Sequence, residues 1–126
     1  MSQDLYELNL RDDFEKVLSC EDAARWKLEI PAQLEVWATV SSMKDKGDPP
    51  ERFQARLLWT AYPDQAPSLK FRDPETGRLD NPRAWPSVRA FRPGSLDACV
   101  NWCIEGLNLH PEWKSDGWIK GTYPDI

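Results

Sequence analysis

Four side chains in this sequence can carry nucleophilic or proton-transfer chemistry: the thiols of Cys20, Cys99 and Cys103 and the imidazole of His110. A cysteine reacts as its thiolate, so a catalytic thiol must be reachable and its charge must be stabilised. Cys20 follows a helical segment and has no basic residue next to it, which is typical of a turn residue. Cys99 and Cys103 are therefore the candidates for covalent chemistry.

The cysteine and histidine content indicates free thiols and no metal site. Three cysteines are an odd number in a chain without a secretion signal, which favours thiols over a disulfide framework. One histidine and the lack of a C-x-x-C spacing do not supply the usual ligands of structural zinc. The sequence predicts neither a metal nor another cofactor.

The charge pattern argues against two classes of partner. The chain carries 21 acidic and 16 basic side chains, a formal net charge of −5, without a long run of one sign. Nucleic-acid-binding proteins usually present a basic patch, so nucleic acid is not an expected partner. No apolar run approaches the roughly 18 residues of a membrane span, and the N-terminus does not resemble a signal peptide. We expect a soluble, cytoplasmic protein without a membrane partner.

The elements that must position the thiols begin with a helix. A chain of 126 residues with a hydrophobic fraction of 40% predicts one domain over residues 1–126. Apolar residues between Leu5 and Leu18 recur at helical spacing, which predicts an amphipathic helix. Ser19 and Asp22 form a capping pair, so the helix is expected to break near Ser19.

Between Trp26 and Ser42 apolar and polar residues alternate, which predicts strands with one apolar face. Leu34 is the first apolar residue of the second strand in this pattern. Pro31 cannot donate a backbone hydrogen bond, so it is expected at a sheet edge or a bulge. A turn rich in charge, glycine and proline, residues 44–51, leads into the next strand.

The stretch from Phe53 to Phe71 combines strand pattern and turn signals. The first strand has a polar face, which carries Gln54, and an apolar face. The apolar face carries Phe53, Ala55, Leu57 and Trp59. A second short strand with Leu69 and Phe71 on one side follows Pro67. Helix followed by sequential strands predicts an α+β fold, in which helix Leu5–Leu18 packs on an antiparallel meander.

The C-terminal half alternates between irregular and regular patterns. Arg72 to Trp85 is rich in turn residues and is expected to be irregular, and Ser87 to Phe91 fits a short strand. From Ser95 to Leu107 two structures fit. One is a regular helix that buries both cysteines on its apolar face, and the other is an irregular cysteine-bearing segment before a short helix. Residues 114–126 are expected to wrap irregularly around the core.

Five residues with distinctive spacing resemble the centre of the ubiquitin-conjugating enzyme (UBC-like) fold: Tyr62, Pro63, Pro67, Leu69 and Phe71. The order of helix, meander and cysteine-bearing segment is similar as well, and the short C-terminal part resembles compact bacterial members. The resemblance implies that a cysteine accepts ubiquitin or a ubiquitin-like protein from an activating enzyme as a thioester. The thioester is then transferred to an amine. A ubiquitin-like protein and its activating enzyme are the implied partners.

Two alignments with the family motif place different cysteines at the catalytic position. In the preferred one, Cys103 through Leu107 resemble the segment that begins with the family cysteine. In the other, Gly94 precedes Cys99 as a glycine precedes the family cysteine. The resemblance therefore implies Cys103 as the nucleophile, with Cys99 as the second choice.

Three further residues near the cysteines have two interpretations each. His110 is either a proton acceptor or part of an ordinary His-Pro turn. Asp97 and Glu105 either help to deprotonate an incoming lysine or belong to a solvated face.

The alternative to an enzyme is a noncatalytic UBC-like or RWD-like module that binds a protein through its sheet or its Tyr-Pro region. The sequence does not indicate an oligomeric state.

Overall fold

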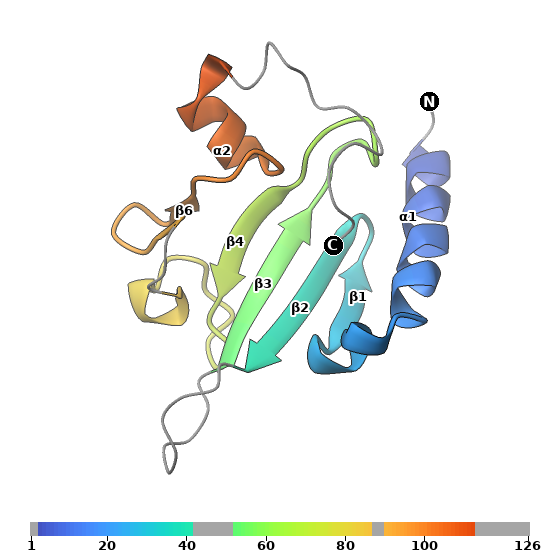
Figure 1. The fold of residues 1–126 in the computed structure, drawn as a ribbon, viewed down its shortest axis with the longest axis horizontal. Coiled ribbons are helices and arrows are strands. Elements are labelled where there is room, and N and C mark those ends of the chain that lie inside the picture. The colour runs from blue at the N-terminus through green and yellow to red at the C-terminus, as the bar shows by residue number, and fades with distance from the viewer. Residues whose placement is uncertain (1–2, 42–51, 87–89, 113–126) are drawn as a thin grey trace.

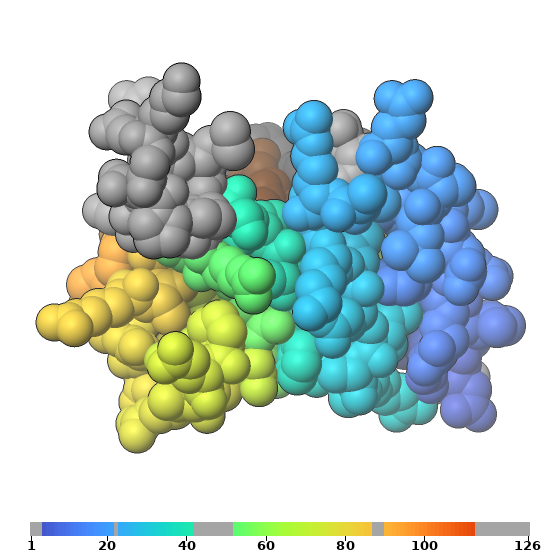
Figure 2. All heavy atoms as spheres, turned by 90° about the horizontal axis from the view of Figure 1, so that it is seen from below, coloured from blue at the N-terminus to red at the C-terminus, as the bar shows by residue number. Residues whose placement is uncertain are grey.

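The computed structural model describes residues 3–41, 52–86 and 90–112, which form an α+β fold (Figure 1). The elements in chain order are α1 (Gln3–Leu18), the 3-10 turn η1 (Glu21–Arg25), β1 (Leu28–Ala32), β2 (Glu35–Ser41), β3 (Arg52–Leu58), β4 (Ser68–Arg72), the 3-10 turn η2 (Pro82–Ala84), β5 (Phe91–Arg92), β6 (Asp97–Ala98) and α2 (Ile104–Leu109). Seen from below, α1 forms one flank of the molecule, and the β4–η2 region forms the opposite flank (Figure 2).

Helix α1 confirms the prediction from helical spacing. Asp4 lies in its first turn and Lys16 in its last, which suits the helix dipole. The side chain of Leu10 faces the core and is 4% exposed. The helix ends where the sequence predicts a break: the hydroxyl of Ser19 donates to the Lys16 carbonyl at 2.6 Å, and η1 follows.

The four long strands form the predicted antiparallel meander, in the order β1-β2-β3-β4. Leu57 of β3 pairs with Val36 of β2 and with Leu69 of β4, so apolar residues stand side by side on one face. Pro31 lies in β1 at the sheet edge, where the β1–β2 register shifts between Glu29 and Ala32. Both expectations for this proline are therefore confirmed.

Leu34 was expected within a strand but lies in the turn between β1 and β2. Its φ of 56° is in the left-handed region, which is uncommon for a branched side chain. The side chain is nevertheless 2% exposed and belongs to the hydrophobic core. The alternating pattern places Leu34 on the apolar face, and the side chain is buried. The pattern does not reveal that the backbone of Leu34 forms a turn.

One core connects the helix, the sheet and the cysteine-bearing segment. Its buried members come from all three regions: Leu10, Leu34, Val36, Leu57, Trp59, Leu69, Ala98 and Cys103. The opposite face of the sheet is polar but also closely packed, because buried Gln54 donates to Thr39 at 3.1 Å and accepts from Arg72. The Arg72 guanidinium in turn lies 4.3 Å from the ring centroid of Trp37.

The Tyr-Pro region joins these parts. The peptide bond between Tyr62 and Pro63 is cis, and the Tyr62 hydroxyl donates to Asp13 of α1. The Tyr62 ring packs edge-on against Trp59, with ring centroids 5.2 Å apart. Pro67 is buried, and its carbonyl accepts from the Ile104 amide at 2.8 Å.

Phe71, the last residue of the predicted motif, is 5% exposed. Its ring centroid lies 5.2 Å from those of both Trp85 and Phe91. The residues that carry the sequence motif therefore hold α1, the sheet and the C-terminal segment together.

The regular helix considered for Ser95 to Leu107 is wrong, and the irregular alternative is confirmed. Leu96 has a φ of 57°, Asp97 and Ala98 form β6, and α2 begins only at Ile104. The left-handed Leu96 interrupts right-handed helix geometry. Of the predicted strand from Ser87 to Phe91, Phe91 is observed as strand, whereas Ala90 lies in a turn with a φ of 78°. Residues 87–89 lie outside the described part, as do residues 114–126.

Among the helices within the described ranges, none is long and apolar enough to span a membrane.

Candidate functional site

The hairpin of β5 and β6 brings Cys99 to the surface of the core. Phe91 pairs with Ala98 and Arg92 with Asp97, and the Cys99 amide continues the ladder by donating to the Ala90 carbonyl at 2.7 Å. Because side chains alternate along a strand, Ala98 points inward, where it is 0% exposed. Cys99 lies on the outer face and is half-buried.

Helix α2 brings His110 next to this hairpin. A Cβ on Gly106 would lie 1.7 Å from the Val100 carbonyl oxygen, so only glycine lets the helix approach the residue after Cys99 this closely. The His110 amide then closes the helix by donating to the Gly106 carbonyl at 3.0 Å. The close packing at Gly106 is therefore what places His110 beside Cys99.

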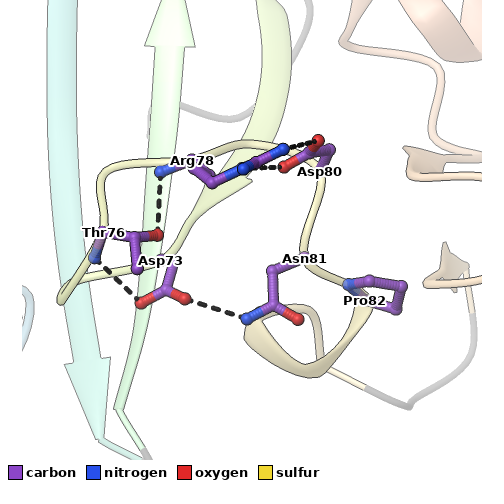
Figure 3. Close-up of a pocket in the computed structure, with 6 residues that line it drawn as sticks. All are labelled: Asp73, Thr76, Arg78, Asp80, Asn81 and Pro82. Atoms are coloured by element: carbon purple, nitrogen blue, oxygen red, sulfur yellow. Dashed lines mark hydrogen bonds and ion pairs between the residues drawn. The ribbon is translucent and has the colours of Figure 1, made fainter.

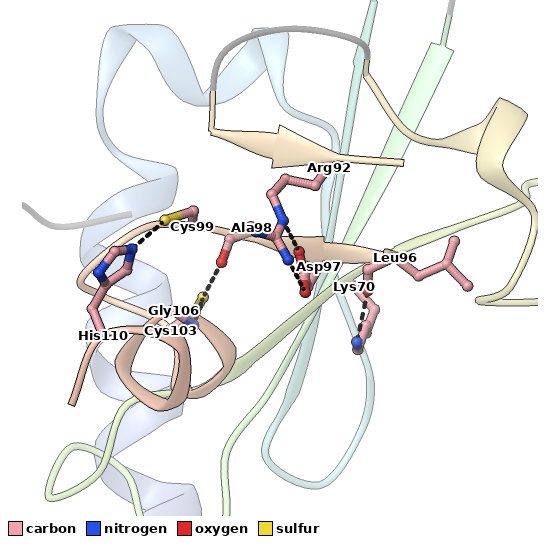
Figure 4. A network of polar contacts seen from close by, with 9 residues as sticks. All are labelled: Lys70, Arg92, Leu96, Asp97, Ala98, Cys99, Cys103, Gly106 and His110. Carbon is pink, nitrogen blue, oxygen red and sulfur yellow. Dashed lines mark hydrogen bonds and ion pairs between the residues drawn. The ribbon is translucent and has the colours of Figure 1, made fainter. Parts of the chain in front are cut away.

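Cys99, His110 and Glu112 form a hydrogen-bonded chain. The Cys99 sulfur lies 3.0 Å from Nε2 of His110 (Figure 4), and Nδ1 of His110 lies 2.9 Å from Oε1 of Glu112. A carboxylate only accepts hydrogen bonds, so Nδ1 carries the hydrogen and Nε2 of a neutral imidazole can accept the thiol proton. This is the arrangement of a nucleophile, a general base and a group that orients the base.

The electrostatics support an ionised Glu112. Its own backbone amide and then the His110 ring lower the pKa of the Glu112 carboxyl. The side chains of His110 and Glu112 are 38% and 67% exposed, so a substrate can reach them from solvent. The site therefore combines an accessible base with a half-buried thiol.

Cys103, the preferred nucleophile at the level of sequence, has a different environment. It is 0% exposed, and burial is the main cause that raises the pKa of its thiol to about 11. Its sulfur accepts from the Gly106 amide at 3.4 Å and lies 3.6 Å from the Ala98 carbonyl oxygen (Figure 4). Cys103 therefore caps α2 and is buried, whereas Cys99, the second choice at the level of sequence, is the more exposed of the two thiols.

Glu105 and Asp97 are both held in structural contacts. The Glu105 carboxylate accepts from the Ser68 hydroxyl and, at 2.9 Å, from the Leu69 amide, which ties α2 to β4. Asp97 accepts two hydrogen bonds from Arg92, at 2.7 and 3.1 Å (Figure 4). Neither carboxylate is hydrogen-bonded to the Cys99–His110 pair, in contrast to the proton-transfer role considered for them.

Glu112 is the functional candidate that sequence reasoning missed. It lies two residues after His110, with Pro111 between them. A histidine followed at this spacing by a carboxylate is a signal for an oriented base, but its significance depends on the thiol that the fold brings to the other ring nitrogen.

A separate shallow depression of about 270 Å³ lies in the segment after β4 (Figure 3). Its polar side chains form hydrogen bonds and an ion pair with one another. Asp73 accepts a hydrogen bond from the Asn81 side chain at 2.8 Å, and Arg78 forms an ion pair with Asp80 at 2.7 Å. The hydrogen bond from Asn81 is the main cause that lowers the pKa of Asp73. These contacts stabilise the loop. Among the described residues, no three His, Cys, Asp or Glu side chains are grouped as a metal site.

Comparison with known proteins identifies no relative: no family model matches the chain, and neither a curated protein nor a solved structure gives a match. Function must therefore be inferred from the site itself.

Proposed function

We propose that this protein is a cysteine acyl carrier and transferase: Cys99 accepts an acyl group as a thioester and passes it to an amine. The observation that carries this proposal is the chain from Cys99 through His110 to Glu112, with distances of 3.0 and 2.9 Å. A thiol within reach of a base that is itself oriented by a carboxylate is an activated nucleophile.

The residues have complementary roles in the two half-reactions. In the first, Nε2 of His110 takes the thiol proton, the Cys99 sulfur bonds to the carbonyl carbon of a donor thioester, and the donor thiolate leaves and takes the proton from His110, which becomes neutral again. In the second, an amine bonds to the same carbon, the Cys99 thiolate leaves, and His110 takes a proton from the amine. Glu112 stabilises the imidazolium in both.

The acyl group that we propose is the C-terminus of a ubiquitin-like protein, delivered by its activating enzyme. This part of the proposal depends on the resemblance of the sequence around Tyr62 and Pro63 to ubiquitin-conjugating enzymes. An N-terminal helix, a four-stranded antiparallel meander and an irregular cysteine-bearing segment are compatible with it. The exposed site also suits a macromolecular donor better than a small enclosed ligand.

A noncatalytic protein-binding module is the second candidate, and the outer surface of α1 favours it. Leu8 is 56% exposed and lies beside Asp4, Glu7 and Arg11 in a shallow depression. An apolar side chain among charged ones is a common feature of protein interaction surfaces. Such a module would not require a reactive Cys99.

The test is acylation by p-nitrophenyl acetate, followed by discharge to free lysine. We expect an acetyl group on Cys99, located by mass spectrometry of peptides, that is lost on addition of lysine. Cys99→Ala should abolish it, while Cys20→Ala should not. Ubiquitin with its activating enzyme and ATP then tests the donor class. Absence of acylation at Cys99 would exclude the carrier and favour the binding module.

A further inference from the structure

A cationic side chain lies on the same face of the β5–β6 hairpin as the proposed nucleophile. Cys99 follows directly after β6, two residues beyond Asp97, and its amide extends the ladder to Ala90, while Arg92 is the cross-strand partner of Asp97. Side chains two apart on a strand share a face, and their Cα atoms are about 7 Å apart. The register of the hairpin thus puts Arg92 on the same face as Cys99.

Asp97 holds this guanidinium in one orientation. Nε and Nη2 of Arg92 donate to the two carboxylate oxygens at 2.7 and 3.1 Å (Figure 4). The Asp97 side chain is 17% exposed, whereas that of Arg92 is 46% exposed. A guanidinium has five N–H donors, and this pairing uses two of them. The Nη1 donors remain for a group at the surface.

Cys99 also contributes to the electrostatic environment of Arg92. Asp97 is the main cause that raises the pKa of Arg92, and Cys99 contributes in the same direction. Lys70, a further cation of this network, is directed elsewhere: its Nζ donates to the Leu96 carbonyl at 2.8 Å and lies 6.0 Å from the Trp85 ring centroid. Of these two cations, only Arg92 lies on the same face of the hairpin as Asp97 and has an electrostatic interaction with Cys99.

We propose that Arg92, oriented by Asp97, binds the oxyanion that forms when the Cys99 thiolate adds to a thioester carbonyl. This inference rests on the proposed function. As the new bond between sulfur and carbon forms, the carbonyl π electrons move to the oxygen, and Arg92 donates hydrogen bonds to it without giving up a proton. When the intermediate collapses, the C=O bond is restored and the bond to the leaving thiolate breaks.

Preorganisation gives this arrangement its catalytic value. Donors already fixed at the place where charge develops need no rearrangement during the reaction, and one such donor typically contributes about 10²–10³-fold to the rate. Because Arg92 is partly exposed, water also solvates the oxyanion. We therefore expect a smaller contribution of about 10- to 100-fold.

The experiment compares two reactions of Cys99 in the intact protein. Acylation by p-nitrophenyl acetate passes through an oxyanion, whereas alkylation by iodoacetamide does not. We expect Arg92→Ala to slow acylation by about 10- to 100-fold and to change alkylation by less than about twofold. Arg92→Lys keeps the charge but not the fork and should fall between, and Asp97→Asn should resemble it.

Arg78→Ala is the matched control, because Arg78 makes the same paired hydrogen bonds to Asp80, at 2.8 and 2.7 Å, in the loop after β4. It should leave both reactions unchanged. Equal losses of acylation and alkylation in Arg92→Ala would overturn the oxyanion role, and so would two unchanged rates. If thermal unfolding shows that the Arg92→Ala protein is not folded, the rates of acylation and alkylation are compared in Arg92→Lys instead, and the same outcomes decide. A wild-type Cys99 that is never acylated would instead refute the proposed function.

Discussion

At the scale of single residues, the environments of two cysteines separate a candidate nucleophile from a structural thiol. Cys99 is half-buried and is hydrogen-bonded to His110, whereas Cys103 is fully buried and caps α2. The two thiols thus differ in solvent access because their neighbours differ, and burial raises the pKa of Cys103.

Removal of the His110 base should slow reactions of Cys99. His110→Asn deletes the ring nitrogen 3.0 Å from the sulfur, and we expect iodoacetamide alkylation near neutral pH to slow by about tenfold. Glu112→Gln should give a smaller loss, because an amide still accepts from Nδ1 but does not stabilise the imidazolium. Peptide mapping by mass spectrometry measures both rates. An unchanged rate in His110→Asn would show that the imidazole does not activate the thiol.

Cys103 should make stability depend on alkaline pH. The pKa of a cysteine thiol is ordinarily 9.0, and burial in the fold raises the pKa of Cys103 to about 11. Between these values the folded state holds more protons than the unfolded state, so stability falls as the pH rises. Cys103→Ser keeps a side-chain cap and does not ionise, which removes this component.

Urea unfolding of wild type and Cys103→Ser at about pH 8 and about pH 10.5 checks this prediction. The wild type should lose more free energy of unfolding over this interval than the variant. Other groups that titrate there are common to both proteins and cancel in the comparison. Equal losses would contradict a protonated, buried Cys103.

At the scale of elements, the position of α2 assembles the site. Pro67 accepts from the first amide of α2, Glu105 ties the helix to β4, and Gly106 packs on the Val100 carbonyl. Of the two α-helices in the described part of the chain, α2 is the shorter, with 6 residues, and isolated helices of this length are unstable in water. Its existence therefore depends on these tertiary contacts.

Gly106→Ala should damage both stability and the site. The new Cβ would lie 1.7 Å from a backbone oxygen, so α2 or the cysteine segment must shift, and we expect a loss of about 3 kcal/mol or more. Gly94→Ala is the control, because a Cβ there meets nothing within 4 Å and should leave stability within about 1 kcal/mol. Urea unfolding measures both. A Gly106→Ala protein as stable as Gly94→Ala would mean that the close contact is absent in solution.

At the scale of the whole molecule, one core makes the site dependent on the fold. Leu10 of α1, Leu69 of β4 and Cys103 belong to a single buried cluster, which also contains Ala98 next to Cys99. Disruption at the sheet should therefore reach the cysteine segment, because interior packing transmits strain.

Leu69→Ala tests this coupling. Leu69 is 2% exposed, and its truncation should lower the free energy of unfolding by about 2–5 kcal/mol. Opening of the fold should then expose Cys103, so its alkylation should become faster. Leu8→Ala, at a position 56% exposed, should change stability by less than about 0.5 kcal/mol. Alkylation of Cys103 that does not change in Leu69→Ala would show that the cysteine segment opens independently of the sheet.

Local sequence pattern determined α1 and the meander. Side chains repeat with a period of 3.6 residues on a helix and 2 on a strand, so Leu10 and the pair of Leu57 and Leu69 could be assigned to buried faces from spacing alone. The pattern failed at Leu34 and between Ser95 and Leu107. In both places a residue with positive φ changes the direction of the chain. Apolar spacing carries no information about such a residue.

The sequence by itself determined the α+β class, the order of the elements, and the two cysteines worth considering. Only the tertiary structure shows that Cys103 is buried and that Cys99 is partly exposed beside His110. Exposure and proton transfer depend on tertiary contacts of α2: with β4 through Glu105, and with the turn after Cys99 through Gly106. Because these contacts bury Cys103 and bring His110 to Cys99, the chemistry of each thiol is a property of the folded molecule.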